Sequence, residues 1–444
     1  MIASSPSSPE SPAGAFGARN GLAYGLMGLP LAFAALPLYV ILPNHYAREF
    51  GVPLATLGAV LLGARLFDAF IDPALGQLVD RLFARSAKAV LALGAAAALL
   101  LAVGFVLLFF PPALPPAALV LWATFTLMLT YAGYSALSVA HQAWAALLGG
   151  SEAERSRIIA WREGLGLLGV VTASVLPVVL GLPVTTAVFC VTLALGWLGW
   201  QGAVRPLASP AAPGAPAAPA EQKASTSVWL PWQQARFRRL LAVFMLNGIA
   251  SAVPATLVLF FIQDRLQAPA ALEPLFLGSY FLSAALAIPL WLAAVRRFGL
   301  ARSWLAGMLL AMAVFIWASQ LGAGDVLPFV LVCALSGAAL GADLALPGAL
   351  LAGVVQAGQA RVPALAAGAY FGWWNFATKL NLALAAGLAL PLLGLFGYAP
   401  GVREAGALNV LTLAYCVLPC VLKAMAAASL YVLVIRTPNR ESFP

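Results

Sequence analysis

Runs of about 20 apolar residues, the length that spans the hydrocarbon core of a bilayer, recur along nearly the whole chain. Within the runs, apolar residues do not alternate with polar ones, as the strands of a membrane barrel would require. Only 9% of the 444 residues are charged. Because a bilayer offers no water to backbone groups, each run has to satisfy its hydrogen bonds internally, as a helix. The sequence therefore predicts an all-α membrane protein whose helices are embedded in the lipid bilayer.

We expect twelve transmembrane helices in two groups of six. The predicted spans are 21–43, 53–78, 87–110, 115–141, 157–181, 184–204, 238–262, 272–294, 300–321, 326–357, 363–396 and 407–435. Between the groups, residues 208–227 read ASPAAPGAPAAPAEQKASTS, which is typical of a flexible linker. This layout resembles that of the major facilitator superfamily, in which two pseudo-symmetric six-helix bundles rock about a central site.

The predicted organisation has five parts. They are a disordered tail at 1–20, an N-terminal bundle at 21–205, a linker at 206–237, a C-terminal bundle at 238–436 and a short tail at 437–444.

Lysine and arginine predict the orientation of the chain. The loops on the side of both termini and the linker carry eighteen of these residues, whereas the opposite loops carry only Arg48, Arg265 and Arg403. Because basic loops stay in the cytoplasm, we expect both termini and the linker to be cytoplasmic, in a bacterial-type inner or plasma membrane. The net charge of +9 therefore reflects topology, and we expect no nucleic acid partner.

One predicted span carries unusual charge, in the segment RLFDAFIDPALGQLVDR at 65–81. Arg65, Asp68 and Asp72 share one helix face, and a charge at the bilayer centre costs roughly 2.5–3.5 kcal/mol, so we expect this face to point into the bundle. Two carboxylates one turn apart resist simultaneous ionisation, and a proton or a hard cation such as Na⁺ relieves the repulsion. The stripe predicts a cation site at Asp68 and Asp72. In the alternative interpretation, Arg65 neutralises one acid and the set only joins helices.

The end of the same segment predicts a cytoplasmic gate. Gly76, Asp80 and Arg81 follow the pattern G-x-x-x-D-R, which resembles the superfamily signature between the second and third spans. We expect Gly76 to allow close helix approach, and Asp80 and Arg81 to pair across the bundle halves in one conformation. An ordinary interfacial charge pair is the alternative.

The second half contains a lysine deep within a span. Lys379 requires a partner there, and we expect Asp68 or Asp72 across the bundle, in either a mobile or a fixed pair. The preceding segment, YFGWWNFATK, supplies the candidates Trp373, Trp374 and Asn375. Aromatic side chains stack on sugar rings or form an interfacial belt, and at this depth we expect at least one tryptophan to line a cavity.

Several motifs together resemble one known family. The pattern R-x-x-D-x-x-x-D-P-x-x-G resembles the second helix of the glycoside–pentoside–hexuronide:cation symporters, the family of melibiose permease. SEAERSRIIAWREGLGLLG at 151–169, GADLALPGALLAGVVQ at 341–356 and GAYFGWWNFATKLNLALAAGLALPLLGLFGY at 368–398 resemble its fourth-to-fifth loop, tenth helix and eleventh helix, in that order. The matches span both halves of the chain.

The resemblance implies roles for particular residues. It implies sodium, lithium or proton binding at Asp68 and Asp72, sugar binding at Arg162, and an inward-facing Lys379. Tyr131 lies nearest the place of a fourth-helix acid of the family, so a sugar-binding carboxylate is absent there. Apolar residues also replace an acid of the first helix, near Leu31 and Ala32.

The sequence predicts a cation-coupled symporter of a small polar solute, for which the resemblance suggests a sugar or sugar derivative. A carrier of a lipid-like amphiphile and a non-transporting membrane sensor or scaffold remain alternatives. The chain has no GxxxxGK[ST], HExxH or GxSxG motif, so neither ATP-driven transport nor enzymatic activity is expected, and no cofactor beyond Na⁺ or H⁺. His141 is a candidate proton shuttle or an ordinary satisfied polar residue, and Asp343 is a candidate for the bundle interior, so the roles of both stay open. Lys423 receives no role, and the oligomeric state also stays open.

Overall fold

The computed structural model describes residues 17–52, 54–206, 227–359, 367–398, 401 and 403–436. The first half of the chain forms α1 (Ala18–Gly25), α2 (Gly28–Leu36), η2 (Pro37–Ile41), α3 (Leu42–Glu49), α4 (Leu54–Arg85), α5 (Ala87–Phe109), α6 (Pro116–Leu147) and α7 (Glu152–Gly202). The second half forms α8 (Leu230–Gln233), α9 (Ala235–Phe260), η3 (Phe261–Arg265), η4 (Ala270–Leu272), α10 (Glu273–Phe298), α11 (Leu300–Ala318), α12 (Val326–Gln359), α13 (Ala367–Leu395), α14 (Ala405–Thr412), η5 (Leu413–Val417), α15 (Leu418–Leu430) and η6 (Tyr431–Ile435).

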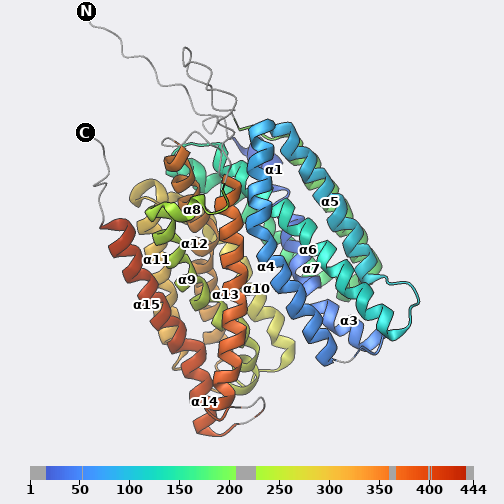
Figure 1. Cartoon of the computed structure of the whole chain (residues 1–444). Coiled ribbons are helices and arrows are strands. Elements are labelled where there is room, and N and C mark those ends of the chain that lie inside the picture. The colour runs from blue at the N-terminus through green and yellow to red at the C-terminus, as the bar shows by residue number, and fades with distance from the viewer. Residues whose placement is uncertain are drawn as a thin grey trace, which may run out of the picture.

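These elements make up the twelve expected spans, so the predicted fold class is confirmed. The first span is built from α1 to α3, and the last from α14 to η6 (Figure 1). The fifth and sixth spans are both within α7, which breaks at Gly181, where φ is 76°; glycine adopts such a conformation without steric cost. Nine segments among the described residues are long and apolar enough to cross a membrane on those criteria alone.

The predicted tail and linker boundaries need adjustment. Helix α1 begins at Ala18, inside the predicted tail 1–20, and α8 and the start of α9 lie inside the predicted linker 206–237. The segment before α8 is held against α13, because the indole N–H of Trp373 donates to the carbonyl of Val228 at 2.8 Å. Residues 1–16, 207–226 and 437–444 lie outside the described part of the chain.

Local sequence determines where α7 begins. The Ser151 hydroxyl accepts from the amide of Glu154, and the Glu154 carboxylate accepts from the amide of Ser151 at 2.7 Å. This is a capping box, which satisfies two amides at the helix start. It is the arrangement that the spacing of Ser151 and Glu154 predicts.

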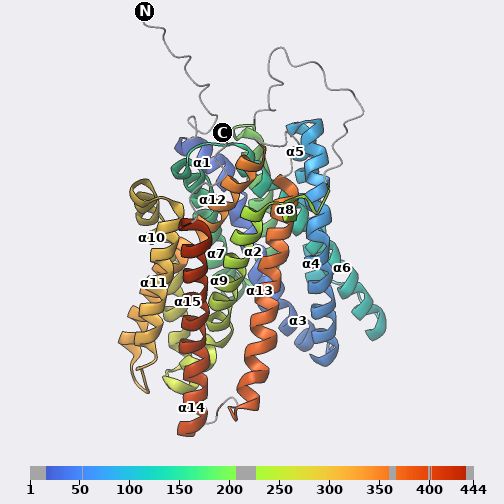
Figure 2. The same ribbon diagram turned by 60° about the vertical axis from the view of Figure 1, so that its left-hand side comes forward.

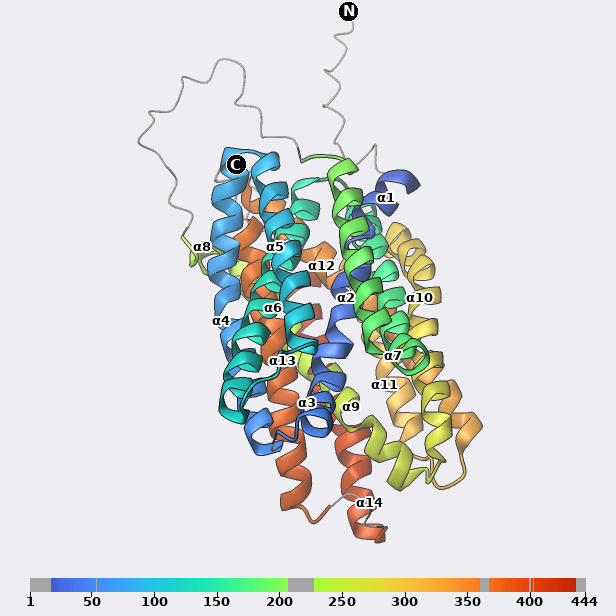
Figure 3. The ribbon, with the colours of Figure 1, turned by 90° about the vertical axis from the view of Figure 1, so that its right-hand side faces the viewer.

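The two bundles meet along two helix pairs related by the pseudo-symmetry of the fold. Helix α4 packs against α13, and the first part of α7 packs against α10 (Figure 3). We call the end of the molecule where α1 begins and α7 ends the terminal face. Helices α4 and α13 are adjacent near the terminal face and spread apart towards the opposite end (Figures 1 and 2).

Hydrogen bonds between the bundles close the terminal face. The amide of Leu300 donates to the Glu152 carboxylate at 2.9 Å, and the Arg155 guanidinium donates to the Gln356 side chain at 2.9 Å. Both contacts join α7 to the second bundle. The structure is therefore a conformer that is closed at the terminal face.

The crossing of α4 and α13 depends on glycine. A Cβ atom on Gly76 would lie 2.2 Å from the carbonyl oxygen of Gly368, and a Cβ on Gly368 would lie 2.2 Å from that of Gly76. A Cβ on Gly372 would lie 2.5 Å from the carbonyl of Asp72. The two backbones are in direct contact, so no side chain fits between them.

We predict that Gly76→Ala weakens the closed terminal face. The added methyl group forces backbone movement, and overpacking of this kind typically costs about 1–3 kcal/mol. The measurement is the thermal unfolding midpoint, together with labelling of a cysteine placed at Val79, which is buried in the closed conformer and should react faster in the variant. Gly63→Ala on the same helix is the control, since a Cβ there meets nothing within 4 Å. Equal behaviour of the two variants would contradict the assigned crossing.

Candidate functional site

A cavity of about 410 Å³ lies between the two bundles. We call it the central cavity. Both halves contribute polar side chains to its wall, including Ser135, Arg162, Glu163, Asp343, Asn375 and Lys379. Its volume is within the range of small-molecule sites in proteins. The arrangement has the size and the two-sided lining that an alternating-access solute site requires.

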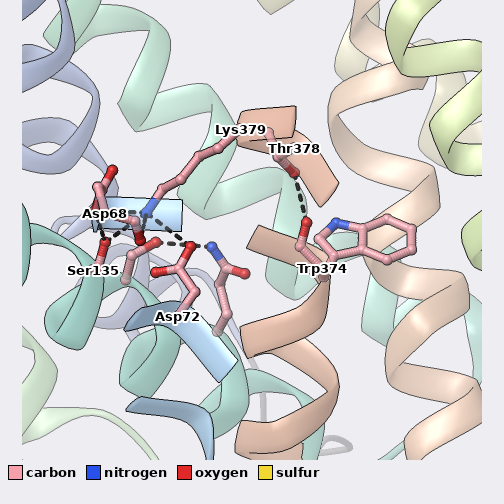
Figure 4. Close-up of polar contacts among 8 residues, drawn as sticks. Asp68, Asp72, Ser135, Trp374, Thr378 and Lys379 are labelled. Carbon is pink, nitrogen blue, oxygen red and sulfur yellow. Dashed lines mark hydrogen bonds and ion pairs between the residues drawn. The ribbon is translucent and has the colours of Figure 1, made fainter. Parts of the chain in front are cut away.

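The ammonium of Lys379 joins the two bundles beside this cavity. It extends from α13 to Asp68 Oδ1 at 2.7 Å and to Asp72 Oδ2 at 2.8 Å, both on α4 (Figure 4). It also donates to the Ser135 hydroxyl at 2.7 Å, and that hydroxyl donates to Asp68 at 2.6 Å. Lys379 therefore pairs with both acids, where the sequence predicted one or the other. The site is formed by residues of α4, α6 and α13.

The two carboxylates differ in how well they are satisfied. Asp68 is 2% exposed and accepts from Ser135 as well as from Lys379. Asp72 is fully buried, and its Oδ1 accepts no hydrogen bond from the residues that the structure describes. A buried charge without full hydrogen bonding is costly, so Asp72 is the acid at which a proton or a cation gains most.

Arg65 does not follow the acids into the interior. Its side chain is exposed, although it interacts with Tyr131 and with the charge of Asp68. The expectation that all three charges of the stripe point inward is therefore wrong for Arg65. It lies one turn beyond Asp68 on the side where α4 and α13 spread apart, so the second bundle covers it less than it covers the acids. Tyr131 is 1% exposed and lies beside this cluster.

Arg162 lines the central cavity from α7 and has a partner next to it in sequence. Its Nη1 lies 2.5 Å from Glu163 Oε1, and about a fifth of each side chain is exposed, 17% and 22%. Glu163 was not among the predicted site residues. The pair gives the first bundle a donor and an acceptor that both face the solute space.

The two candidate tryptophans have different surroundings. Trp374 lines the central cavity and stacks on Phe244 with ring centroids 3.7 Å apart. Trp373 packs against Trp229 and Trp232 of the segment that follows the linker, at 5.2 and 5.1 Å. One tryptophan therefore lines the cavity, as expected, and the other anchors the chain that connects the bundles.

The gate residues form a contact that the sequence did not predict. Asp80 is fully buried and accepts from the amides of Gly368 and Ala369 at 2.6 and 2.8 Å, in the first turn of α13. A carboxylate at a helix N-terminus is stabilised by the free amides and the helix dipole. Arg81 is exposed. The link across the halves therefore runs from the Asp80 carboxylate to backbone amides of α13.

A second buried ion pair lies wholly within the C-terminal bundle. Lys423 on α15 lies 2.9 Å from Asp343 on α12, and Lys423 is 3% exposed. Lys423 also donates to Asn247 and Ser251 of α9, at 2.8 and 3.1 Å. The sequence analysis gave Lys423 no role and left the role of Asp343 open. The sequence did contain a signal for this pair. The two residues carry opposite charges in the middle of spans of the same half, and charged residues inside a membrane usually pair with each other.

His141 has a structural environment. Its ring stacks on Tyr24 with centroids 4.1 Å apart, its Nε2 lies 2.9 Å from the Tyr24 carbonyl, and the Tyr24 hydroxyl donates to the His141 carbonyl at 3.0 Å. These bonds join α1 to α6 inside the first bundle.

Two six-helix bundles around a solute-sized cavity define a transporter of the major facilitator superfamily, which is not an enzyme. The sequence profile of the family described as MFS/sugar transport protein matches residues 21–437, so the chain belongs to that family. No curated protein matches the chain.

Solved structures share the fold at low identity. A bacterial homologue of the iron transporter ferroportin, in an outward-facing state, superposes with a TM-score of 0.68 at 14% identity, covering 94% of this chain and 99% of its own. The E. coli fucose:proton symporter FucP gives 0.62 at 16% identity, covering 94% and 99%. The human organic anion transporter TETRAN gives 0.60 at 18% identity, covering 93% and 100%.

We predict that Lys423→Met destabilises the protein by about 3–5 kcal/mol, because removal of one partner leaves a buried charge uncompensated. The double variant Lys423→Met/Asp343→Asn should recover most of the loss. Unfolding midpoints of the purified protein measure both effects, with the exposed Lys88→Met as the control. A double variant as unstable as Lys423→Met alone would show that the two residues do not act as a pair.

Proposed function

We propose that the protein is a cation-coupled secondary transporter that carries a small polar solute by alternating access. The coupling cation is Na⁺ or H⁺. The observation that carries the proposal is the position of the Lys379 ammonium, which belongs to one bundle and lies between two buried acids of the other. Ionised groups inside a membrane are energetically costly, and those that occur there usually serve a function.

The ammonium occupies the place that a coupling cation would take. Four oxygens surround it, from the Asp68 and Asp72 carboxylates, the Ser135 hydroxyl and the Asp68 carbonyl at 3.2 Å. Hard oxygen ligands suit Na⁺, and protonation of an acid would equally remove the attraction for Lys379. In either case the incoming ion displaces Lys379 and breaks an electrostatic link between the bundles.

Displacement of Lys379 couples the ion to the solute. Lys379 lines the central cavity together with Asn375 and Trp374, so its release changes the surface that the solute meets. An ion that binds one conformer better shifts the population towards it. By linkage, the solute that binds the same conformer then increases the affinity for the ion.

The solute class rests on weaker support. The family description names sugar transport, and the motifs on α4, α12 and α13 resemble the glycoside–pentoside–hexuronide:cation symporters, to which we assign the chain. The fold neighbours carry different cargoes by their names, iron, fucose and organic anions, so the fold does not choose among them. We propose a sugar or sugar derivative.

Orientation follows from the basic loops. The sequence assigns eighteen lysines and arginines to the side of the termini, or seventeen without Arg162, which lines the central cavity, against three on the other side. We propose that the terminal face is cytoplasmic, in a plasma or bacterial inner membrane. The conformer described above is then closed to the cytoplasm.

We predict that Asp68→Asn and Asp72→Asn each lower gradient-driven uptake at least tenfold. Proteoliposomes containing the full chain are screened with radiolabelled sugars and polyols under an inward Na⁺ gradient and, separately, a pH gradient. Glu49→Gln, which alters an exposed carboxylate, should transport like the wild type. Undiminished uptake by both asparagine variants would refute the coupling assignment. A scaffold protein would show no uptake under any gradient.

We also predict that the coupling cation stabilises the folded protein. A ligand at 100 times its Kd adds about 2.7 kcal/mol to the free energy of unfolding. Unfolding midpoints are compared in NaCl and choline chloride at equal ionic strength. A higher midpoint in NaCl, lost in Asp68→Asn/Asp72→Asn, identifies Na⁺. A midpoint that is insensitive to Na⁺ leaves the proton as the coupling ion.

A further inference from the structure

A second cavity, of about 160 Å³, lies inside the C-terminal bundle between α9, α10, α11 and α12. We call it the outer cavity, because it lies further from the terminal face than the central cavity does. Val258 of its wall follows Phe244 of the central cavity along α9, and Leu340 precedes Leu344 along α12. Asp343 lines both cavities. It therefore stands at their junction.

The carboxylate of Asp343 is fixed in place and neutralised. Its Oδ1 accepts from the Trp304 indole at 2.8 Å and from the Asn247 amide at 3.0 Å. Its Oδ2 accepts from Lys423 at 2.9 Å and from the Ser251 hydroxyl at 3.2 Å. Even so, 13% of the side chain remains exposed. Four donors fill the acceptor sites of a carboxylate. A ligand hydroxyl that reaches the exposed part of Asp343 would therefore replace the Ser251 hydroxyl, whose bond to Oδ2 is the longest of the four.

The charges around both cavities are grouped in clusters of opposite sign. Arg155, which also lines the central cavity, is acted on by the charges of Glu152 and Glu154. Lys423 neutralises Asp343, and Glu163 neutralises Arg162. Lys379 bridges the two acids of α4, and the charge of Arg65 acts on Asp68. A charged ligand would disturb one of these clusters at a desolvation cost. The cavities therefore favour an uncharged ligand with hydroxyl donors.

The wall of the outer cavity is mainly aromatic and aliphatic, with Phe276, Tyr280, Phe315 and Tyr415 among its residues. An apolar cavity of about 150 Å³ accepts a benzene molecule. The outer cavity is therefore large enough for a phenyl ring, and its only charged groups, Asp343 and Lys423, are paired with each other among the residues that the structure describes.

We propose that the outer cavity binds an apolar arm of the transported solute, up to the size of a phenyl ring, while Asp343 accepts a hydrogen bond from a hydroxyl next to that arm. This proposal rests on the proposed transport function, and it narrows the solute to a neutral molecule with one polar and one apolar part. Because the cavity lies within one bundle, the arm keeps the same walls while the bundles rock.

The test uses 4-azidobenzyl alcohol, which combines a photoreactive phenyl ring with one hydroxyl. The full chain in lipid nanodiscs is photolabelled and the labelled residues are located by mass spectrometry. We expect saturable labelling at the wall residues of α10 and α12, displaced by excess benzyl alcohol. 4-Azidotoluene, which lacks the hydroxyl, should need at least fivefold higher concentration for the same labelling. Labelling confined to lipid-facing residues such as Leu286 and Leu290, which are 67% and 72% exposed, would overturn the proposal.

A matched pair of variants on α11 sharpens the test. Ala311→Leu fills the outer cavity and should reduce the saturable labelling at least tenfold, whereas Ala313→Leu lies on the exposed side of the same helix and should leave it unchanged. Equal labelling of the two variants would also overturn the proposal. Displacement by benzyl alcohol in the wild type needs no variant, so the result does not depend on how Ala311→Leu folds.

The two proposals can fail separately. Asp68→Asn/Asp72→Asn should label like the wild type, because its substitutions lie outside the outer cavity. Saturable labelling without gradient-driven uptake would reject the transport function and keep the binding site. Gradient-driven uptake without saturable labelling would reject the apolar arm alone.

Discussion

The ion bridge from Lys379 to Asp68 and Asp72 is the constraint on which the rest of the interface depends. Two buried carboxylates on one helix are unfavourable without a counterion, and the first bundle leaves that counterion to a helix of the second. Separation of the bundles at this level would leave the two acids without this counterion, which is the basis of the coupling that we propose. The same physical cost that makes the charges rare in membranes makes them suitable for coupling.

Helix α4 carries this constraint to the terminal face. Asp68 and Asp80 lie twelve residues apart on one continuous helix, a rise of roughly 18 Å. Between them, Gly76 brings the backbone of α4 against that of α13, and Asp80 then accepts from the first amides of α13. Ion bridge, glycine contact and helix cap all join the same two helices, so loss of the bridge loosens the contact that closes the terminal face.

Much of this could be predicted from sequence, because membrane helices are governed by hydrophobic length and by the cost of charge. The twelve spans, the capping box at Ser151 and the partner of Lys379 follow from such local rules. The contacts of Asp80 and the exposure of Arg65 could not be predicted in this way, because they depend on where α4 and α13 cross and diverge. The Asp343–Lys423 pair is an intermediate case. Both charges are visible in the sequence, but their pairing follows only if two opposite mid-span charges in the same half are expected to bind each other.

The two lysine–aspartate clusters differ in one decisive respect. Lys379 and its acids belong to different bundles, whereas Lys423, Asp343, Asn247 and Ser251 all belong to the second. When rigid bundles rock, distances between bundles change and distances within a bundle do not. Under the proposed coupling, only the first cluster can therefore link the conformational state to the ion. The second cluster keeps its geometry while the bundles rock, which suits the ligand-binding role that we propose for Asp343.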